Sequence, residues 1–286
     1  MIHLLDRYLS TLFFAPLARR RHHEGGAVIP ILMYHSISSE PETETHPYFW
    51  LNTTPEIFAA QLKFLQDNNY QVLTLGRAAE IIYGRAVKDD HAKYAVITFD
   101  DGFRDFYINA FPILQKYGFT ATVFLPTDYI NNHHKKLDGK DHLSWGEITL
   151  LHKQGISFGS HTASHPQLRD SNRADVRHEI EHSRQIIEQR IGAPAESFSY
   201  PFAFPEEDND FTKCLTDTLI AGGYKFGVST RIGRASAKDP ICFMKRLPIN
   251  SRDDLAFFQA KLEGGYDWMH WFQLKSKIIR AKFKSS

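Results

Sequence analysis

Two adjacent carboxylates, Asp100 and Asp101, stand at the end of the apolar run Ala95–Phe99 and are followed by Gly102. Burying two unpaired carboxylates costs several kcal/mol unless a cation or hydrogen bonds compensate, so their position indicates a metal ion. Neighbouring residues at a strand end can point in different directions, so that one carboxylate binds the ion while the other acts as a base. These residues alone also fit an ordinary strand-to-helix turn in which Asp101 caps the next helix.

His161 and His165 form a second candidate group, directly after the apolar segment Ile156–Ser160. Neutral imidazoles are good zinc ligands, and two histidines four residues apart can reach one ion. With 15 histidines in the chain, this spacing alone is weak evidence. The argument depends on position, because two histidines and one aspartate at the same end of a sheet make a common catalytic ligand set for zinc.

Another histidine pair, His178 and His182, formally matches the H-E-x-x-H pattern of zinc proteases. The apolar residues of this segment recur on one helix face, and the two histidines project from roughly the opposite face. We therefore expect solvent-exposed histidines here and not a protease site.

The elements that must position these residues are strands alternating with helices. Apolar, β-branched runs predict eight strands: Pro30–Tyr34, Gln71–Leu75, Tyr94–Phe99, Thr120–Leu125, Ile156–Ser160, Ser197–Pro201, Phe226–Thr230 and Phe243–Pro248. Helix-end signals lie between them: Thr54 with Pro55, Ser144 with Glu147, and Gly118, Gly155 and Gly192. The pattern predicts an α/β fold, a distorted (β/α) barrel of about seven parallel strands, whose catalytic groups cluster past the carboxyl ends of the strands.

Composition favours one large domain, which we assign to residues 28–262. The 286 residues are 42% hydrophobic, enough to fill a sizeable core. Since Lys plus Arg (34) nearly balance Asp plus Glu (33), nothing indicates a nucleic-acid partner. Cys214 and Cys242 are too sparse for a disulfide framework and are expected to be buried thiols. The sequence does not indicate an oligomeric state.

Both ends of the chain fall outside the predicted barrel. No apolar run is long enough to span a membrane, and residues 1–27 are interpreted as an amphipathic leader helix, with a secretory signal as the alternative. Residues 263–286 form a basic, aromatic-containing tail that suits either peripheral contact with anionic lipid or packing on the barrel. We expect a cytoplasmic protein, with membrane association and secretion as open alternatives.

Three motifs closely resemble those of the polysaccharide deacetylase family, the NodB-like carbohydrate esterases: Thr98-Phe-Asp-Asp-Gly102, His161-Thr-Ala-Ser-His165 and Phe198-Ser-Tyr-Pro-Phe-Ala203. The similarity covers residues 28–250. It implies metal-dependent removal of N-acetyl groups from a polysaccharide or oligosaccharide. Asp100 would be the catalytic base, and Asp101, His161 and His165 would bind a divalent metal. Zinc is the first expectation, with cobalt, nickel and iron as alternatives.

The third motif departs from the family pattern, because Ser199 stands where an arginine is frequent and Phe202 where a tyrosine is frequent. The resemblance implies that the backbone N–H of Phe202 helps to form the oxyanion hole. Arg246 could replace the missing arginine beside the base, although a surface cation at a strand end is equally consistent. No late histidine motif is evident, so His35, after the first strand, resembles the general acid of the branch with permuted motif order.

In the implied reaction, Asp100 takes a proton from the attacking water and His35 protonates the leaving amine. Aromatic residues near the motifs are candidates for walls that stack on sugar rings: Tyr34, Tyr48, Trp50, Trp145 and Tyr200. The alternatives are an O-deacetylase or a deformylase acting on a related glycan, and a catalytically silent scaffold that only binds carbohydrate.

Overall fold

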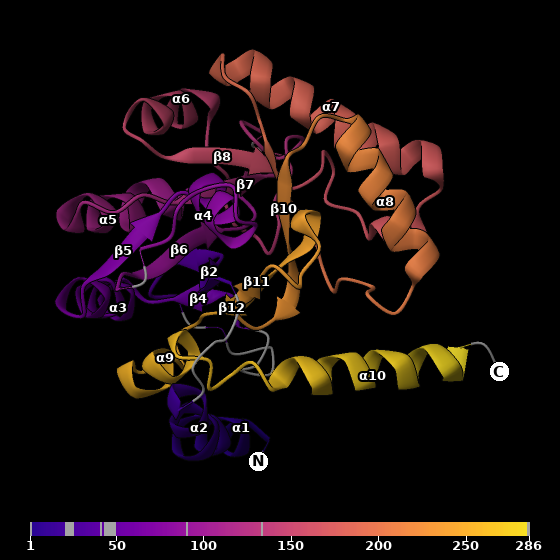
Figure 1. Ribbon diagram of the computed structural model, residues 1–286. Coiled ribbons are helices and arrows are strands. Elements are labelled where there is room, and N and C mark those ends of the chain that lie inside the picture. Colours follow the sequence, from indigo (N-terminus) through magenta and orange to yellow (C-terminus); the bar gives the residue numbers. More distant parts are fainter. Residues whose placement is uncertain are drawn as a thin grey trace.

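The computed structural model describes residues 2–20, 26–40, 42, 50–89, 91–132 and 134–284. Parallel strands form its centre and helices surround them (Figure 1). The strands of the main sheet are β2 (Ile31–Tyr34), β5 (Tyr70–Leu73), β6 (Lys93–Phe99), β7 (Thr122–Leu125), β8 (Ser157–Ser160), β9 (Ser197–Ser199), β10 (Phe226–Ile232) and β12 (Met244–Pro248). Each overlaps one of the eight predicted runs, with ends that differ by up to a few residues.

The sheet closes into a barrel because β2 pairs with two strands. Leu32 is in register with Leu247 of β12 on one side and with Ile97 of β6 on the other. The ring therefore contains seven strands in the order β2, β12, β10, β9, β8, β7 and β6, and β5 adds to the outside of β6. The predicted barrel of about seven parallel strands is confirmed.

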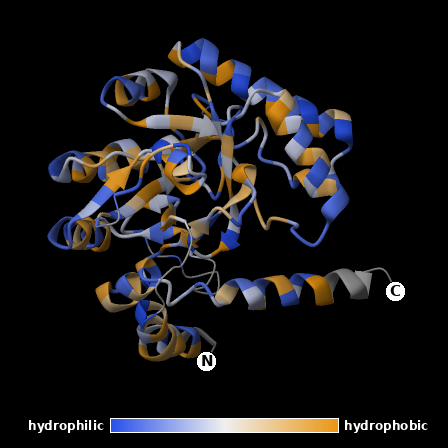
Figure 2. Ribbon diagram, in the orientation of Figure 1, coloured by the Kyte–Doolittle hydropathy of each residue, from blue (hydrophilic) through white to orange (hydrophobic). Residues whose placement is uncertain are grey.

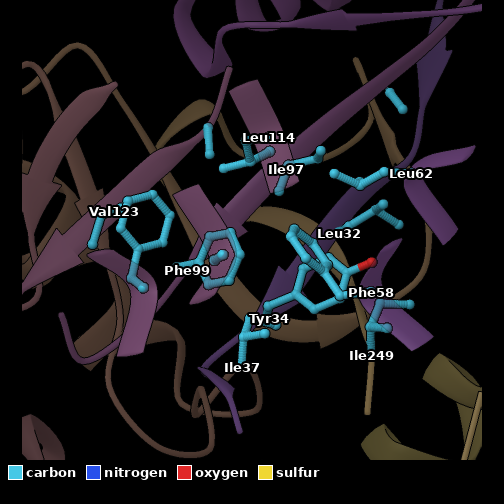
Figure 3. Close-up of a cluster of buried hydrophobic side chains, with 14 of the residues drawn as sticks. Leu32, Tyr34, Ile37, Phe58, Leu62, Ile97, Phe99, Leu114, Val123 and Ile249 are labelled. Carbon is cyan, nitrogen blue, oxygen red and sulfur yellow. The ribbon is translucent and has the colours of Figure 1, made fainter. Parts of the chain in front are cut away.

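Alternation along β6 sorts its side chains between two cores. Ile97 and Phe99 belong to the cluster between the strands and the outer helices, which Figure 3 shows with Tyr34 and Phe58. Val96 belongs to the other cluster, with Val228 and Met244 of strands across the barrel. Because strand side chains alternate with a period of two, Asp100 continues the inward row of Val96 and Thr98.

Helices follow most strands, and their ends carry the expected caps. They are α3 (Pro55–Asp67), α4 (Leu75–Ile82), η3 (Phe106–Ala110), α5 (Phe111–Tyr117), α6 (Trp145–Lys153), η4 (Leu168–Asp170), α7 (Arg173–Ile191), α8 (Asn209–Ala221), η5 (Ile241–Phe243) and α9 (Leu255–Leu262). Thr54 caps α3, and Ser144 and Glu147 form the predicted capping box of α6. Gly118 and Gly192 end their helices in the left-handed conformation, as expected.

Both chain ends are helical and lie together at one end of the molecule (Figure 1). The first segment comprises α1 (Ile2–Tyr8), η1 (Leu9–Phe14) and α2 (Ala15–Arg20), and the last helix is α10 (Met269–Lys284). Tyr266 Oη donates to Asp6 Oδ2 at 3.2 Å, and Trp268 Nε1 donates to Ser10 Oγ at 3.0 Å. Two short ladders pair β1 (Val28–Ile29) with β11 (Ala235–Ser236) and β3 (Ser36–Ile37) with β4 (Asn52–Thr53).

Three expectations outside the barrel can be compared with the structure. His178 is exposed on α7, and the His182 ring lies 5.0 Å from it on the same side of the helix. Cys242 is a buried free thiol, but Cys214 is only half-buried because it lies beside the buried face of α8. Among the described residues, no helix combines the length and the apolar character needed to cross a membrane.

Candidate active site

Asp101, His161 and His165 converge past the carboxyl ends of β6 and β8. Asp101 Oδ1 lies 3.4 Å from His161 Nε2 and 3.3 Å from His165 Nε2. One ligand atom from each residue falls within 4.8 Å of the other two, and in the described part of the chain this is the one such group of three. Asp101 Oδ1 is buried and accepts no hydrogen bond. A cation between the three atoms would satisfy that oxygen, so the donor set fits a metal ion.

The sequence folds into this geometry through unusual backbone conformations. Asp101 has φ +66° and His165 has φ +56°, values that side-chain-bearing residues rarely adopt. Gly102 follows with φ +57°, and a Cβ there would lie 2.8 Å from Leu125 Cδ2. In the Asp-Asp-Gly turn, the side chain of Asp101 therefore points away from the inward-facing side chains that Asp100 continues. The last position of the turn requires glycine.

The loop His161–His165 is held in place by groups around it. His161 Nδ1 donates to the carbonyl of Ser199 at 2.8 Å, which directs its Nε2 toward Asp101. Glu179 on α7 accepts from the backbone N–H groups of Ala163 and Ser164, both at 2.8 Å. Sequence reasoning missed Glu179, although it lies inside the H-E-x-x-H pattern of α7. Its role is to fix the loop of the other histidine pair.

Asp100 forms a buried, bidentate ion pair with Arg246. Arg246 Nη1 lies 2.8 Å from Asp100 Oδ1 and Nη2 lies 2.7 Å from Oδ2, and the arginine has no exposed surface. Ser199 Oγ completes the contact by accepting from Arg246 at 3.0 Å and donating to Asp100 at 3.2 Å. Burial alone would raise the pKa of Asp100, but the guanidinium outweighs it and the pKa lies below its usual value. The surface-cation interpretation of Arg246 is wrong.

The imidazoles and Asp101 influence one another in the same enclosed space. Burial would raise the pKa of Asp101, yet the nearby imidazoles of His161 and His165 hold it well below the usual range. His35 Nε2 lies 4.0 Å from Asp100 Oδ2, and burial lowers the pKa of this histidine. His35 thus lies beside the predicted base, as its position after β2 suggested.

Phe202 lies over the metal-ligand group. Its ring is 4.6 Å from the ring of His165, and its backbone has φ +59°. Its carbonyl accepts from Thr230 Oγ1 at 2.8 Å, and Thr230 Oγ1 also accepts from the N–H of Phe204 at 2.9 Å. These bonds fix the loop after β9, where the resemblance places the oxyanion hole.

Helix α10 braces this loop from outside. Gln273 donates to the carbonyl of Thr230 at 2.8 Å and accepts from the N–H of Ile232 at 3.1 Å. Lys277 Nζ donates to the carbonyl of Phe204 at 2.7 Å. Further along the loop, Glu206 accepts from His270 at 2.7 Å. Burial would raise the pKa of Glu206, but this hydrogen bond and the charges of Lys277 and Arg231 lower it to about 2. No sequence pattern indicates this bracing.

The prediction of sugar stacking is wrong for two of the five aromatic residues. Tyr34 is completely buried between the barrel and α3, where it stacks on Phe99 and its hydroxyl donates to Gln61 at 2.8 Å (Figure 3). Tyr200 is 2% exposed and packs edge-on against Phe204. Tyr34 directly precedes His35, and Tyr200 directly follows Ser199. Because side chains alternate along a strand, both tyrosines point away from the site.

The other three aromatic candidates have different outcomes. Trp145 packs on the core at the start of α6, with the Arg190 guanidinium of α7 5.6 Å from its ring, so it faces a helix and not the site. Trp50 is half-buried and lies under Arg252, 4.8 Å from the guanidinium, near the strand-end residue Asn250. Its contact with sugar stays a prediction. Tyr48 lies outside the described residues.

His142 is an additional buried group that sequence reasoning missed. It is 8% exposed, and its ring lies 5.3 Å from that of Phe103 and 5.2 Å from that of Tyr129. Neither ring nitrogen has a hydrogen-bond partner. Burial lowers its pKa to about 4 despite the nearby Asp101, so the ring is neutral at neutral pH.

Comparison with known proteins identifies the family. The sequence model described as polysaccharide deacetylase matches residues 87–216. YxkH of Bacillus subtilis, which is named as a polysaccharide deacetylase, is 31% identical over 240 residues, covering 84% of this chain and 78% of YxkH. The chain belongs to the polysaccharide deacetylase family. This deacetylase is therefore a hydrolase of the carbohydrate esterase type, as the motifs predicted.

Further relatives agree in sequence and fold. The deacetylase is 23% identical over 232 residues to poly-β-1,6-N-acetyl-D-glucosamine N-deacetylase of Staphylococcus aureus, which covers 75% of both chains. The solved structure of the Streptococcus pyogenes deacetylase PplD, in complex with acetate, superposes with a TM-score of 0.71 at 25% identity. The match covers 83% of this chain and 99% of PplD, so it includes the whole barrel of the relative.

Proposed function

We propose that this deacetylase removes acetyl groups from the amino-sugar nitrogens of an N-acetylated glycan. One observation carries the proposal: the unpartnered Asp101 Oδ1 and two imidazole Nε2 atoms converge beside Asp100, whose two oxygens are clamped by Arg246. A metal ion held by this group would act as a Lewis acid on the amide carbonyl, and the adjacent ionised carboxylate would act as the base.

Zinc is the proposed metal. Two imidazole nitrogens and one carboxylate oxygen form a mixed N/O donor set that zinc commonly takes in catalytic sites, whereas magnesium and calcium prefer oxygen alone. Cobalt, nickel and iron accept the same donors. When bound, such an ion polarises a carbonyl group and lowers the pKa of water.

Asp100 is proposed as the base that accepts the proton of the attacking water. Arg246 and Ser199 fix both of its oxygens, so the carboxylate cannot rotate away or join Asp101 as a ligand. The lowered pKa keeps Asp100 ionised at neutral pH. The ion pair therefore ensures that the base is deprotonated and oriented before a substrate arrives.

His35 and Phe202 are proposed to complete the reaction. Burial lowers the pKa of His35, so its protonated ring is a stronger acid than an exposed histidine and can deliver a proton to the leaving nitrogen. The backbone N–H of Phe202 would stabilise the developing negative charge on the acetyl oxygen. The loss of one such donor typically slows catalysis by about 10²–10³.

The substrate class is proposed from the relatives. The Staphylococcus aureus relative is named for a β-1,6-linked N-acetylglucosamine polymer, and the PplD structure contains acetate, the expected product. A polymer of N-acetylglucosamine is therefore the first candidate. Trp50, whose ring lies 4.8 Å from the Arg252 guanidinium, is the proposed contact for a sugar ring.

Acetate release tests the proposal. The full chain is incubated with β-1,6- and β-1,4-linked N-acetylglucosamine oligomers, an O-acetylated glycan and an N-formylated one, each with and without a chelator. We expect acetate from an N-acetylated oligomer, loss with chelator and recovery with added zinc. Release only from the O-acetylated or formylated glycan would support those alternative activities, and binding without any release would support the silent scaffold.

A further inference from the structure

Large exposed apolar side chains concentrate at the two ends of the chain. Of the fourteen that are exposed among the described residues, eight lie in the terminal helices: Leu5, Tyr8, Leu12, Phe13, Leu17, Trp271, Phe272 and Ile279. Leu12 is 73% exposed and Trp271 57%. Figure 2 shows hydrophobic residues recurring along both the N-terminal helices and α10. Scattered exposed apolar residues need no explanation, but a contiguous group does.

Ring contacts join the two segments into one surface. The Phe13 ring is 5.1 Å from Phe14, Phe14 stacks at 5.0 Å on Trp268, Trp268 meets Phe272 at 5.2 Å, and Phe272 meets Trp271 at 4.8 Å. We call these five residues the terminal aromatic ridge. The ridge is continuous although its members come from opposite ends of the sequence. Neither segment forms the surface by itself.

Positive charge accompanies the ridge. Residues 1–21 and 268–286 contain nine Lys or Arg and one acidic residue, which leaves 25 basic against 32 acidic residues in the rest of the chain. The one acid, Asp6, is buried and accepts from Tyr266. Arg7, Arg19 and Lys277 pair with acids of the barrel side. Lys275 is exposed, with its ammonium 5.7 Å from the Trp271 ring.

We propose that the terminal aromatic ridge docks this enzyme on an anionic membrane surface. Aromatic side chains flanked by lysine and arginine, with no exposed acid within the two terminal segments themselves, suit the boundary between lipid headgroups and acyl chains. The positive charge argues against a second copy of the chain as the partner, because two such faces would repel each other. The inference extends the membrane contact expected of the tail to a joint surface that also includes the first helices.

The helix that carries part of the ridge also contacts the catalytic end of the barrel. Helix α10 bonds to Thr230 and Ile232 in the second half of β10 and to Phe204 after β9. These residues lie at the carboxyl ends of the strands, where Asp101 and the histidines converge. Docking would therefore hold the catalytic end of the barrel close to the lipid surface, within reach of glycans attached to it.

Vesicle flotation with the full-length protein tests the proposal. The vesicles contain phosphatidylcholine alone or phosphatidylcholine with phosphatidylglycerol. Wild type should float with the anionic vesicles and not with the neutral ones. The variant Trp271→Ser/Phe272→Ser should reduce the partition coefficient by about tenfold or more, because two large apolar side chains no longer enter the interface. Lys275→Glu should reduce it by at least about fivefold.

Matched controls lie elsewhere on the surface. Ile220→Ser removes a side chain on α8 that is 59% exposed, and Lys153→Glu reverses an exposed charge on α6. Both controls should float like wild type. All variants should keep the wild-type melting temperature and activity on a soluble oligomer, which separates docking from folding and catalysis.

Three results would overturn the proposal. They are absence of wild-type flotation with anionic vesicles, equal flotation with neutral vesicles, and flotation of Trp271→Ser/Phe272→Ser equal to that of Ile220→Ser. Sedimentation velocity adds a fourth outcome. A dimer that dissociates in the Trp271→Ser/Phe272→Ser variant would show that a second copy covers the ridge and that the membrane does not.

Discussion

Replacing Arg246 with methionine should both destabilise the protein and shift its pH dependence. The guanidinium donates to Asp100 at 2.7 and 2.8 Å, to Ser199 at 3.0 Å, to the Ser229 carbonyl at 3.1 Å and to Thr98 at 3.2 Å. Methionine keeps much of the length but no donor. Asp100, 2% exposed, would then be a buried charge without its cation, with only the hydroxyl of Ser199 left to donate to it.

The magnitude follows from that burial. Removing one partner of a buried ion pair typically costs about 3–5 kcal/mol, whereas an exposed pair contributes about 0.2–1 kcal/mol. We therefore expect Arg246→Met to lower the free energy of unfolding at neutral pH by about 3–5 kcal/mol. Arg77→Met, which breaks the exposed pair with Glu80, serves as the control and should cost less than about 1 kcal/mol.

The pH dependence has a definite sign. In wild type the folded-state pKa of Asp100 lies below its ordinary value, so the ion pair stabilises the protein above that ordinary value, and the contribution is lost as the pH falls through the folded-state pKa. Without Arg246, burial raises the pKa of Asp100. The difference in stability between wild type and Arg246→Met should accordingly shrink as the pH is lowered.

Urea denaturation of wild type, Arg246→Met, Asp100→Asn and the double variant across pH measures these effects. The double variant should lose less free energy of unfolding than the two single variants lose together, because it leaves no unpaired charge. The acid limb of the activity profile of Arg246→Met should also move to higher pH. A loss in Arg246→Met no larger than that in Arg77→Met, or additive losses in the double variant, would refute the argument.

Two further predictions concern the supports around the site. Glu179→Gln should weaken metal affinity by about 10–100-fold, because the loop between the histidines loses a charged acceptor. Calorimetric zinc titration measures this affinity, with His182→Ala as the control, and equal affinities in the two variants would contradict the prediction. Gln273→Ala should lower kcat on a soluble oligomer by about tenfold, because a shifted Phe202 loop weakens the hydrogen bond from its N–H to the oxyanion. Gln115→Ala, on α5, is the control, and an unchanged kcat in Gln273→Ala would show that the loop does not need this support.

The sequence predicted the barrel because its signals are local. Strands such as β2 and β7 are short, largely apolar runs, and the caps at Thr54 and Ser144 lie within a few residues of the helices they start. The convergence of Asp101, His161 and His165 followed from one rule, that strand carboxyl ends share one edge of the sheet. The same rule placed His35 beside Asp100.

What the sequence could not supply depends on long-range contacts and side-chain direction. Arg246 lies 146 positions from Asp100, and only barrel closure brings β12 to β2 and across from β6. The misplaced Tyr34 lies next to His35, and alternation sends one side chain to the core and the other to the site. Glu179 and Gln273 act from helices on backbone groups, for which no sequence pattern exists.

Metal content, measured beside acetate release, shows whether Asp101 and the two histidines bind the metal while Asp100 is the base. Zinc is determined in purified wild type, Asp100→Asn and His161→Ala. We expect one zinc per chain in wild type and in Asp100→Asn, acetate release only in wild type, and neither metal nor release in His161→Ala. Equal loss of zinc in Asp100→Asn and His161→Ala would contradict it.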